Sequence, residues 1–123
     1  MTGTSSALHQ LLLALAEPPE HCASLGHWRW AVRQRMAGVR DALVGESDHP
    51  ADGWLAARGV AIVRERNALL ARLSALGPAV LECPDLERVR ADLKRLVVDI
   101  NHHRQRLHDL AYDEVELELG GSE

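Results

Sequence analysis

The sequence predicts an all-α fold, an up-down antiparallel bundle of three long helices preceded by a shorter N-terminal helix. Only 3% of the 123 residues are aromatic and Phe is absent, so the core has to be built from aliphatic side chains, which favours helices over sheets. Apolar residues recur at spacings of three and four along four segments. Short stretches rich in Gly, Pro, Ser and Asp separate these segments, and short connections make neighbouring helices antiparallel.

The composition is that of one globular domain spanning residues 1–123, with 46% apolar and 26% charged residues. A net charge of −4 gives the whole molecule no electrostatic preference for nucleic acid or an anionic membrane. The apolar run Leu11–Ala16 is short and has no preceding positive charge, and no window reaches the ~20 apolar residues of a membrane helix. We therefore expect a cytoplasmic protein. The use of Arg with a single Lys suggests a bacterial source.

The first helix is predicted over residues 4–17, after a cap by Thr4 or one of the two following serines and before the Pro18-Pro19 pair. One face is almost entirely leucine and includes Leu8 and Leu12. Such a face has to pack on its own bundle or on another chain. We expect it to form part of an interaction surface, with a homodimer as the simplest assembly.

The second and third helices are predicted over about 24–44 and about 52–76. The second stripe consists of Leu25, Trp28, Val32, Met36, Val39 and Leu43. The third consists of Leu55, Gly59, Ile62, Arg66, Leu69, Leu73 and Leu76. Residues 45–50 form the loop between them, and Gly77-Pro78 is expected to close the third helix.

The fourth helix opens at Pro84-Asp85 and has the most regular apolar stripe of the chain. From Asp109 to Glu123 there are six acids and no base. Residues 113–123 are interpreted as an acidic C-terminal tail, either a fraying helix end or a short extended arm. Such a tail is a solvated terminus or a recognition arm for a basic surface.

Antiparallel pairing about the Gly77–Pro84 turn places Gly59 opposite His103 and Gly38 near Gly59. Each glycine inside a helix costs about 0.5–1 kcal/mol of stability relative to Ala, so the presence of two glycines in one layer with His103 calls for an explanation. Tight helix packing around a buried His103 is the favoured interpretation. The alternative is a small pocket for a ligand or metal, with His103 as its polar anchor and Asp99, one turn earlier, as a partner.

The sequence does not favour a metal site. Asp99 and His103 have a spacing that could share an ion, but His102 and His108 project in other directions, and the second and third stripes offer arginines rather than carboxylates. We predict no metal and no cofactor. Cys22 and Cys83 precede parallel helices at the same end of the bundle, and reduced thiols are the expected state.

Trp30 lies away from the stripe of the second helix and is flanked by arginines, among them Arg29 and Arg33. This group is a candidate anchor for a protein partner, whereas the negative net charge and the lack of a recognised module argue against nucleic-acid binding. No catalytic motif is present. We therefore expect a non-enzymatic bundle that acts through protein-protein interaction, as an adaptor or regulatory subunit. A small-ligand or metal-binding bundle centred on His103 is the alternative.

Overall fold

The computed structural model describes the backbone of residues 3–17, 24–46 and 54–121 and the side chains of these residues except 54–58 and 110–121. The described chain forms four helices: α1 (Gly3–Ala16), α2 (Leu25–Val44), α3 (Trp54–Glu82) and α4 (Leu86–Gly121). No strand occurs within these ranges. The predicted all-α bundle is confirmed.

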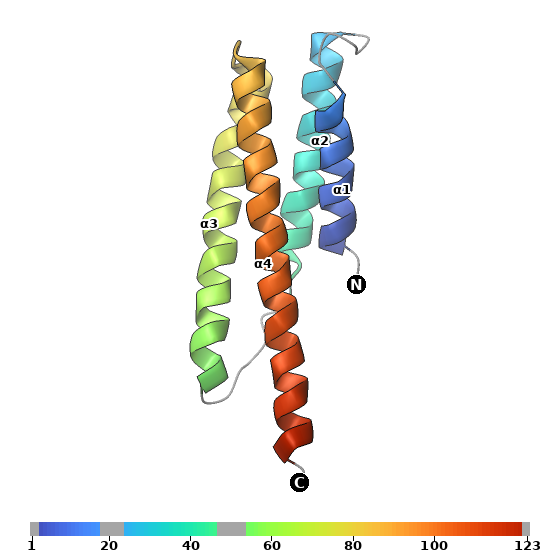
Figure 1. The fold of residues 1–123 in the computed structure, drawn as a ribbon. Helices are drawn as coiled ribbons and strands as arrows, with labels where there is room; N and C mark the ends of the chain where they lie inside the picture. The colour runs from blue at the N-terminus through green and yellow to red at the C-terminus, as the bar shows by residue number, and fades with distance from the viewer. Residues whose placement is uncertain (1–2, 18–23, 47–53, 122–123) are drawn as a thin grey trace.

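Each helix packs against two others, so that α1 lies against α2 and α4, and α3 lies against the same two (Figure 1). The helices differ strongly in length. With 14 residues α1 is about 21 Å long, whereas α4 with 36 residues is about 54 Å long. As a result, α3 and α4 continue beyond the ends of α1 and α2, and the C-terminus lies at the far end of this extension (Figure 1).

The core lies where the four apolar stripes meet, and it is aliphatic except for Trp28 and Met36. Ser24 caps α2 by accepting a hydrogen bond from the backbone N–H of His27 at 3.0 Å. The Trp28 indole donates to the carbonyl of Glu17 at 3.0 Å and thereby joins α2 to the end of α1. Leu8, predicted as an interaction residue, is instead a core residue, because α1 turns Leu8, Leu11 and Leu15 into its own bundle.

The helix α3 does not close at Gly77-Pro78, as expected from the sequence, but continues through both residues to Glu82. Proline removes one helical hydrogen bond, so the continuation needs compensation. Val80, two residues beyond the proline, is fully buried in the core. Arg29 of α2 also donates to the carbonyls of Val80 and Cys83, at 3.4 and 3.1 Å. Burial and these hydrogen bonds hold the last turn in place.

This longer α3 changes how α3 and α4 are aligned. The turn between them lies at Cys83–Asp85 rather than at Gly77, and Glu65 is the α3 residue that contacts His103. Glu65 is six residues along α3 from Gly59, the predicted neighbour, so the predicted pairing was wrong by almost two turns.

Arginines from neighbouring helices bind the carboxyl ends of α1, α2 and α3, none of which has a basic residue in its own last turn. Such cations satisfy free carbonyls and oppose the helix dipole. The contacts are Arg90 Nη2 to Leu15 O at 2.9 Å, Arg66 Nη1 to Glu46 O at 3.5 Å and Arg29 Nη2 to Cys83 O at 3.1 Å. Arg29, Arg66 and Arg90 therefore have structural roles at helix ends, and Arg66 is the one of them that belongs to a predicted stripe.

Candidate functional site

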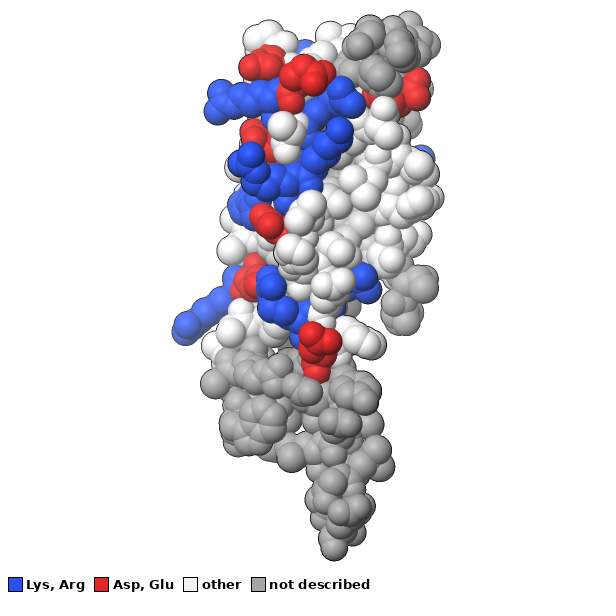
Figure 2. Space-filling view, in the orientation of Figure 1, with Lys and Arg blue, Asp and Glu red and all other residues white. Residues whose placement is uncertain are grey.

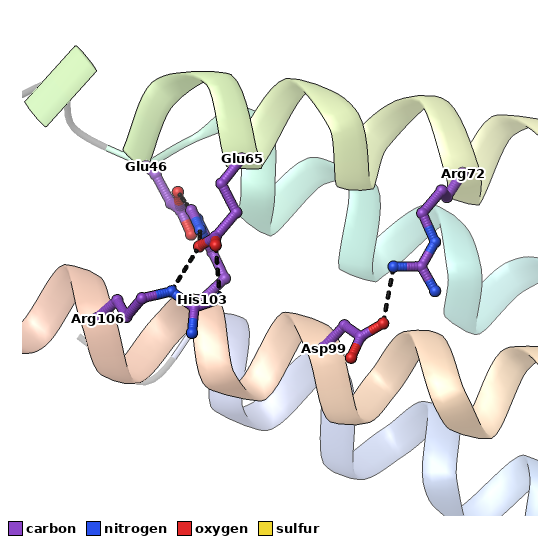
Figure 3. A network of polar contacts seen from close by, with 6 residues as sticks. All are labelled: Glu46, Glu65, Arg72, Asp99, His103 and Arg106. Carbon is purple, nitrogen blue, oxygen red and sulfur yellow. Dashed lines mark hydrogen bonds and ion pairs between the residues drawn. The ribbon is translucent and has the colours of Figure 1, made fainter. Parts of the chain in front are cut away.

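Two places in the described structure gather chemically active side chains. The first is a polar network around His103, whose side chain is completely buried (Figure 3). The ring lies between two carboxylates, with Nδ1 at 2.7 Å from Glu65 Oε1 and Nε2 at 2.8 Å from Glu46 Oε2. Arg106, one turn further along α4, donates to both oxygens of Glu65. The network joins α4 to α3 and to the residue just past α2.

With both glutamates ionised, the geometry of this network calls for a charged imidazole. Both neighbours of the ring are acceptors, and only the protonated imidazolium can donate from both nitrogens. Burial alone would lower the pKa of His103, but the hydrogen bonds and negative charges of Glu46 and Glu65 outweigh it and raise the pKa. With His103 protonated, two carboxylates face one imidazolium and one guanidinium, so the four charges balance.

Glu65 and Glu46 differ in how well their charge is compensated. Burial alone would raise the pKa of Glu65, but the hydrogen bonds and charges of Arg106 and His103 lower it overall. The Glu46 side chain is only 7% exposed, and its Oε1 is buried without a hydrogen-bond partner among the described residues. Glu46 therefore depends on His103 more than Glu65 does.

The arrangement does not match a metal centre. The two carboxylates lie against opposite nitrogens of one ring, so a single ion could not bind the ring and both carboxylates together. Among the residues whose side chains are described, no group of three or more His, Cys, Asp or Glu side chains is arranged so that it could hold a metal ion. Nor does the ring leave a nitrogen for a ligand. In this structure, His103 is an ion-pair centre that fixes helices to one another.

The other predicted members of the His103 layer are not its hydrogen-bond partners. Asp99 pairs with Arg72 of α3 at 2.8 Å and forms no hydrogen bond or ion pair with His103 in the described structure (Figure 3). Gly38 is exposed, and a Cβ added to it would meet nothing within 4 Å. Gly59 is half-buried. The hydrogen bonds of the His103 ring go to Glu65 and Glu46 and not to these three residues.

Sequence reasoning missed Glu46, Glu65 and Arg106. The signal was present in the apolar stripes, because pairing α3 and α4 about Pro84 instead of about the middle of residues 77–84 brings Glu65 opposite His103. Assigning Gly77-Pro78 to the end of the helix hid this pairing. Glu46 carried no comparable signal, since it lies in a segment that reads as a loop.

The second place is a surface hollow of ≈ 490 Å³ along α2, which we call the Trp30 hollow. It is lined by Gly26, Arg29, Trp30, Arg33, Gln34, Ala37 and Leu81. Two of its walls are large apolar side chains exposed to solvent, Trp30 at 59% and Leu81 at 47%. The ring of His27 stacks on Trp30 with centroids 6.3 Å apart. Trp30, Arg29 and Arg33, predicted together as an interaction surface, thus line one hollow.

The two arginines of the hollow differ in exposure and in hydrogen bonding. Arg29 is half-buried and its guanidinium is held by backbone carbonyls of α3. Arg33 is exposed and makes no hydrogen bond or ion pair with the described part of the chain. Its guanidinium lies over Gly77, where a Cβ would approach Nη1 to 3.1 Å. Gly77 therefore gives Arg33 room to lie on α3, and its charge remains available to a ligand.

The outer surface of α1 has a different character. No charged residue occurs between Gly3 and Ala16, and Figure 2 shows an uncharged face there beside the charged side chains over α3 and α4. Leu12 and Leu13 are exposed on this helix, at 41% and 56%. Leu12 is thus exposed, in contrast to Leu8.

Cys83 is a half-buried free thiol packed against the core, whereas Cys22 lies outside the described residues. Within the described ranges, no helix has the length and apolar character needed to cross a membrane. Comparison with protein-family models, curated proteins and solved structures finds no match to this chain.

Proposed function

We propose that this protein is a non-enzymatic helical bundle that binds a protein partner, as an adaptor or regulatory subunit, and that the Trp30 hollow is its binding site. The partner segment this hollow fits is acidic, with an apolar side chain to bury. A contact of this kind is one of the recurring modes in which helices and extended peptides are recognised.

The observation that carries the proposal is the exposed indole of Trp30 beside the guanidinium of Arg33, which has no ion-pair partner among the described residues. Trp and Arg are the residue types that most often dominate the energy of protein interfaces. Arg29, which lines the hollow, is already held in place by hydrogen bonds to the carbonyls of Val80 and Cys83. A preformed surface loses less entropy on binding than a mobile one.

The ligand-binding alternative centred on His103 lacks comparable support. Both ring nitrogens are hydrogen-bonded to glutamates, and Asp99, the proposed polar partner, pairs with Arg72 instead. A ligand would have to displace a buried ion pair to reach His103, at a cost of about 3–5 kcal/mol.

The test uses a synthetic helical peptide in which Leu recurs every third or fourth position among glutamates. We expect it to bind the full chain and to bind the Trp30→Ala variant about 30-fold more weakly, because a hot-spot side chain contributes about 2 kcal/mol or more. Affinities are measured by fluorescence anisotropy of the labelled peptide. Binding should weaken as salt is added, because the contact includes Arg33.

Leu12→Ala is the matched control, since it removes an exposed apolar side chain from α1, away from the hollow. A second control peptide carries Lys in place of each Glu. Equal losses in the Trp30 and Leu12 variants, or equal binding of both peptides, would contradict the proposal.

A further inference from the structure

We propose that the Trp30 hollow is occupied by the acidic C-terminal segment of a second copy of this chain, residues 109–123, in a reciprocal antiparallel dimer. This inference rests on the proposed function, because it names the partner of the same hollow.

The first argument is charge complementarity. The acidic segment carries six carboxylates, Asp109, Asp113, Glu114, Glu116, Glu118 and Glu123, and no Lys or Arg. Helix α2 carries four arginines, Arg29, Arg33, Arg35 and Arg40, against one acid, Asp41. The net charge of −4 is therefore unevenly distributed, with an acidic C-terminal segment and a basic helix α2 in one chain. Complementary charges of this kind select partners and fix their register.

The second argument is position. The hollow lies at the end of the bundle where α2 begins and α3 ends, whereas α4 carries the acidic segment to the opposite end (Figure 1). Because α4 is one continuous helix of about 54 Å, the acidic segment cannot fold back to the hollow of its own chain. Only another molecule can bring the two together.

The third argument is the match in length and pattern. The hollow follows α2 from Gly26 to Ala37, a rise of about 16 Å. The acidic segment is helical to Gly121, and Tyr112, Val115 and Leu119 recur in it at intervals of three and four. These residues span about 10 Å of helix and supply the apolar component that the hollow needs.

The fourth argument is closure. In an antiparallel pair, the acidic end of each copy lies beside the hollow of the other, so both hollows are filled by one two-fold axis. Such an arrangement is closed, whereas a head-to-tail arrangement of the same contact would continue into a chain. The reciprocal dimer satisfies both sites of both copies.

The test exploits this reciprocity with two charge-reversed variants of the full chain, analysed by sedimentation at low micromolar concentration. One carries Arg33→Glu. The other carries Asp113→Lys, Glu114→Lys, Glu116→Lys and Glu118→Lys, which leaves four positive and two negative side chains in the segment. The unmodified chain is expected to be a dimer, and each variant alone should dimerise at least about tenfold more weakly, because in both contacts the substituted side chains repel the charges they would meet.

Mixing the two variants should restore the dimer. In the mixed pair, one contact brings the glutamate introduced into the hollow of the first variant to the introduced lysines of the second. The other contact brings the natural Arg33 of the second variant to the natural acidic segment of the first. Both contacts are therefore attractive again. Arg35→Glu is the matched control, because Arg35 lies on the same helix but does not line the hollow. It should weaken the dimer clearly less than Arg33→Glu does, because charge effects at 0.15 M salt extend only about 8 Å and Arg35 does not line the hollow.

A monomeric unmodified chain, a dimer that survives either charge reversal, or a failure of the mixed variants to associate would each overturn the proposal. Circular dichroism confirms that every variant is folded. If self-association fails while the synthetic acidic peptide still binds in a Trp30-dependent manner, only this inference is wrong. If the peptide also fails to bind, the proposed function is wrong as well.

Discussion

The imidazole of His103 is held in place from three directions, by Glu65 of α3, by Glu46 beyond α2 and by its own helix α4. Such a centre is strongly coupled, because each member compensates the desolvation of its neighbours. Its value lies in fixing the relative position of the elements rather than in large net stability, since burying charges is costly even when they are paired.

Replacing His103 with Leu is expected to lower the free energy of unfolding by about 3 kcal/mol, because it leaves the buried carboxylate of Glu46 without a partner. Urea unfolding measures the change. His102→Leu is the control, since His102 is the adjacent residue and is exposed. It should change stability by no more than about 0.5 kcal/mol.

A double-mutant cycle separates lost packing from lost charge compensation. If Glu46 is first changed to Gln, the cost of His103→Leu should fall, because no buried carboxylate is left uncompensated. Additive effects of the two substitutions, or a His103→Leu variant as stable as the unmodified chain, would show that the ring only fills space.

At the level of the helices, the amphipathic stripes predict which residues enter the core but not how α3 and α4 are aligned. Trp28, Val32, Met36, Val39 and Leu43 are all buried, as their spacing indicates. The alignment depends on where α3 ends, and this is decided by contacts distant in sequence, the burial of Val80 and the hydrogen bonds from Arg29. A local rule about proline cannot include these contacts.

The candidate sites likewise divide into residues that could be predicted from one helix and residues that depend on how the helices are aligned. Trp30 was predictable because a large aromatic residue away from the apolar stripe has to be exposed or paired with another segment. The partners of His103 were not predictable, because an alignment of α3 and α4 that is wrong by six residues places Gly59 opposite His103 instead of Glu65. Residues that act through one helix can be found from periodicity, whereas residues that act across helices require the alignment.

Gly38 provides a prediction at this scale. A Cβ added to Gly38 would meet no neighbour in the folded protein. Alanine would therefore act mainly by lowering the conformational entropy of the unfolded chain, which stabilises the folded state. Gly38→Ala should therefore raise the free energy of unfolding by about 0.5–1 kcal/mol. Thermal or urea unfolding measures this change, and a loss of stability would mean that Gly38 is needed for close approach.

For the molecule as a whole, the distribution of charge matters more than its sum. Arginines from one helix cap the end of another in three places, which places cations on negative helix ends throughout the bundle. The network of Glu46, Glu65, His103 and Arg106 adds a balanced cluster where three elements meet. Global stability should therefore depend on pH through identifiable groups.

The pKa of His103 is raised above its ordinary value of 6.5, so its contribution to stability is complete below about pH 6.5 and is lost as pH rises through the raised native pKa. The pKa of Glu65 is lowered below 4.5, so its contribution is complete above about pH 4.5 and is lost as pH falls through the lowered native pKa. Both contributions are complete only between these limits. Urea unfolding from about pH 3 to about pH 10 should therefore show a stability maximum there.

Two variants assign the two sides of this maximum. His103→Leu should reduce the loss of stability at alkaline pH, because the variant lacks the ring whose deprotonation causes that loss. Glu65→Gln should flatten the acid decline for the corresponding reason, while Arg106 remains able to donate to the amide oxygen. If the difference in stability between His103→Leu and the unmodified chain stayed constant up to about pH 10, the native ring would not be titrating in this range. The opposite result, a difference that shrinks as the ring loses its proton, would identify the charge of His103 as the source of the coupling between α2, α3 and α4.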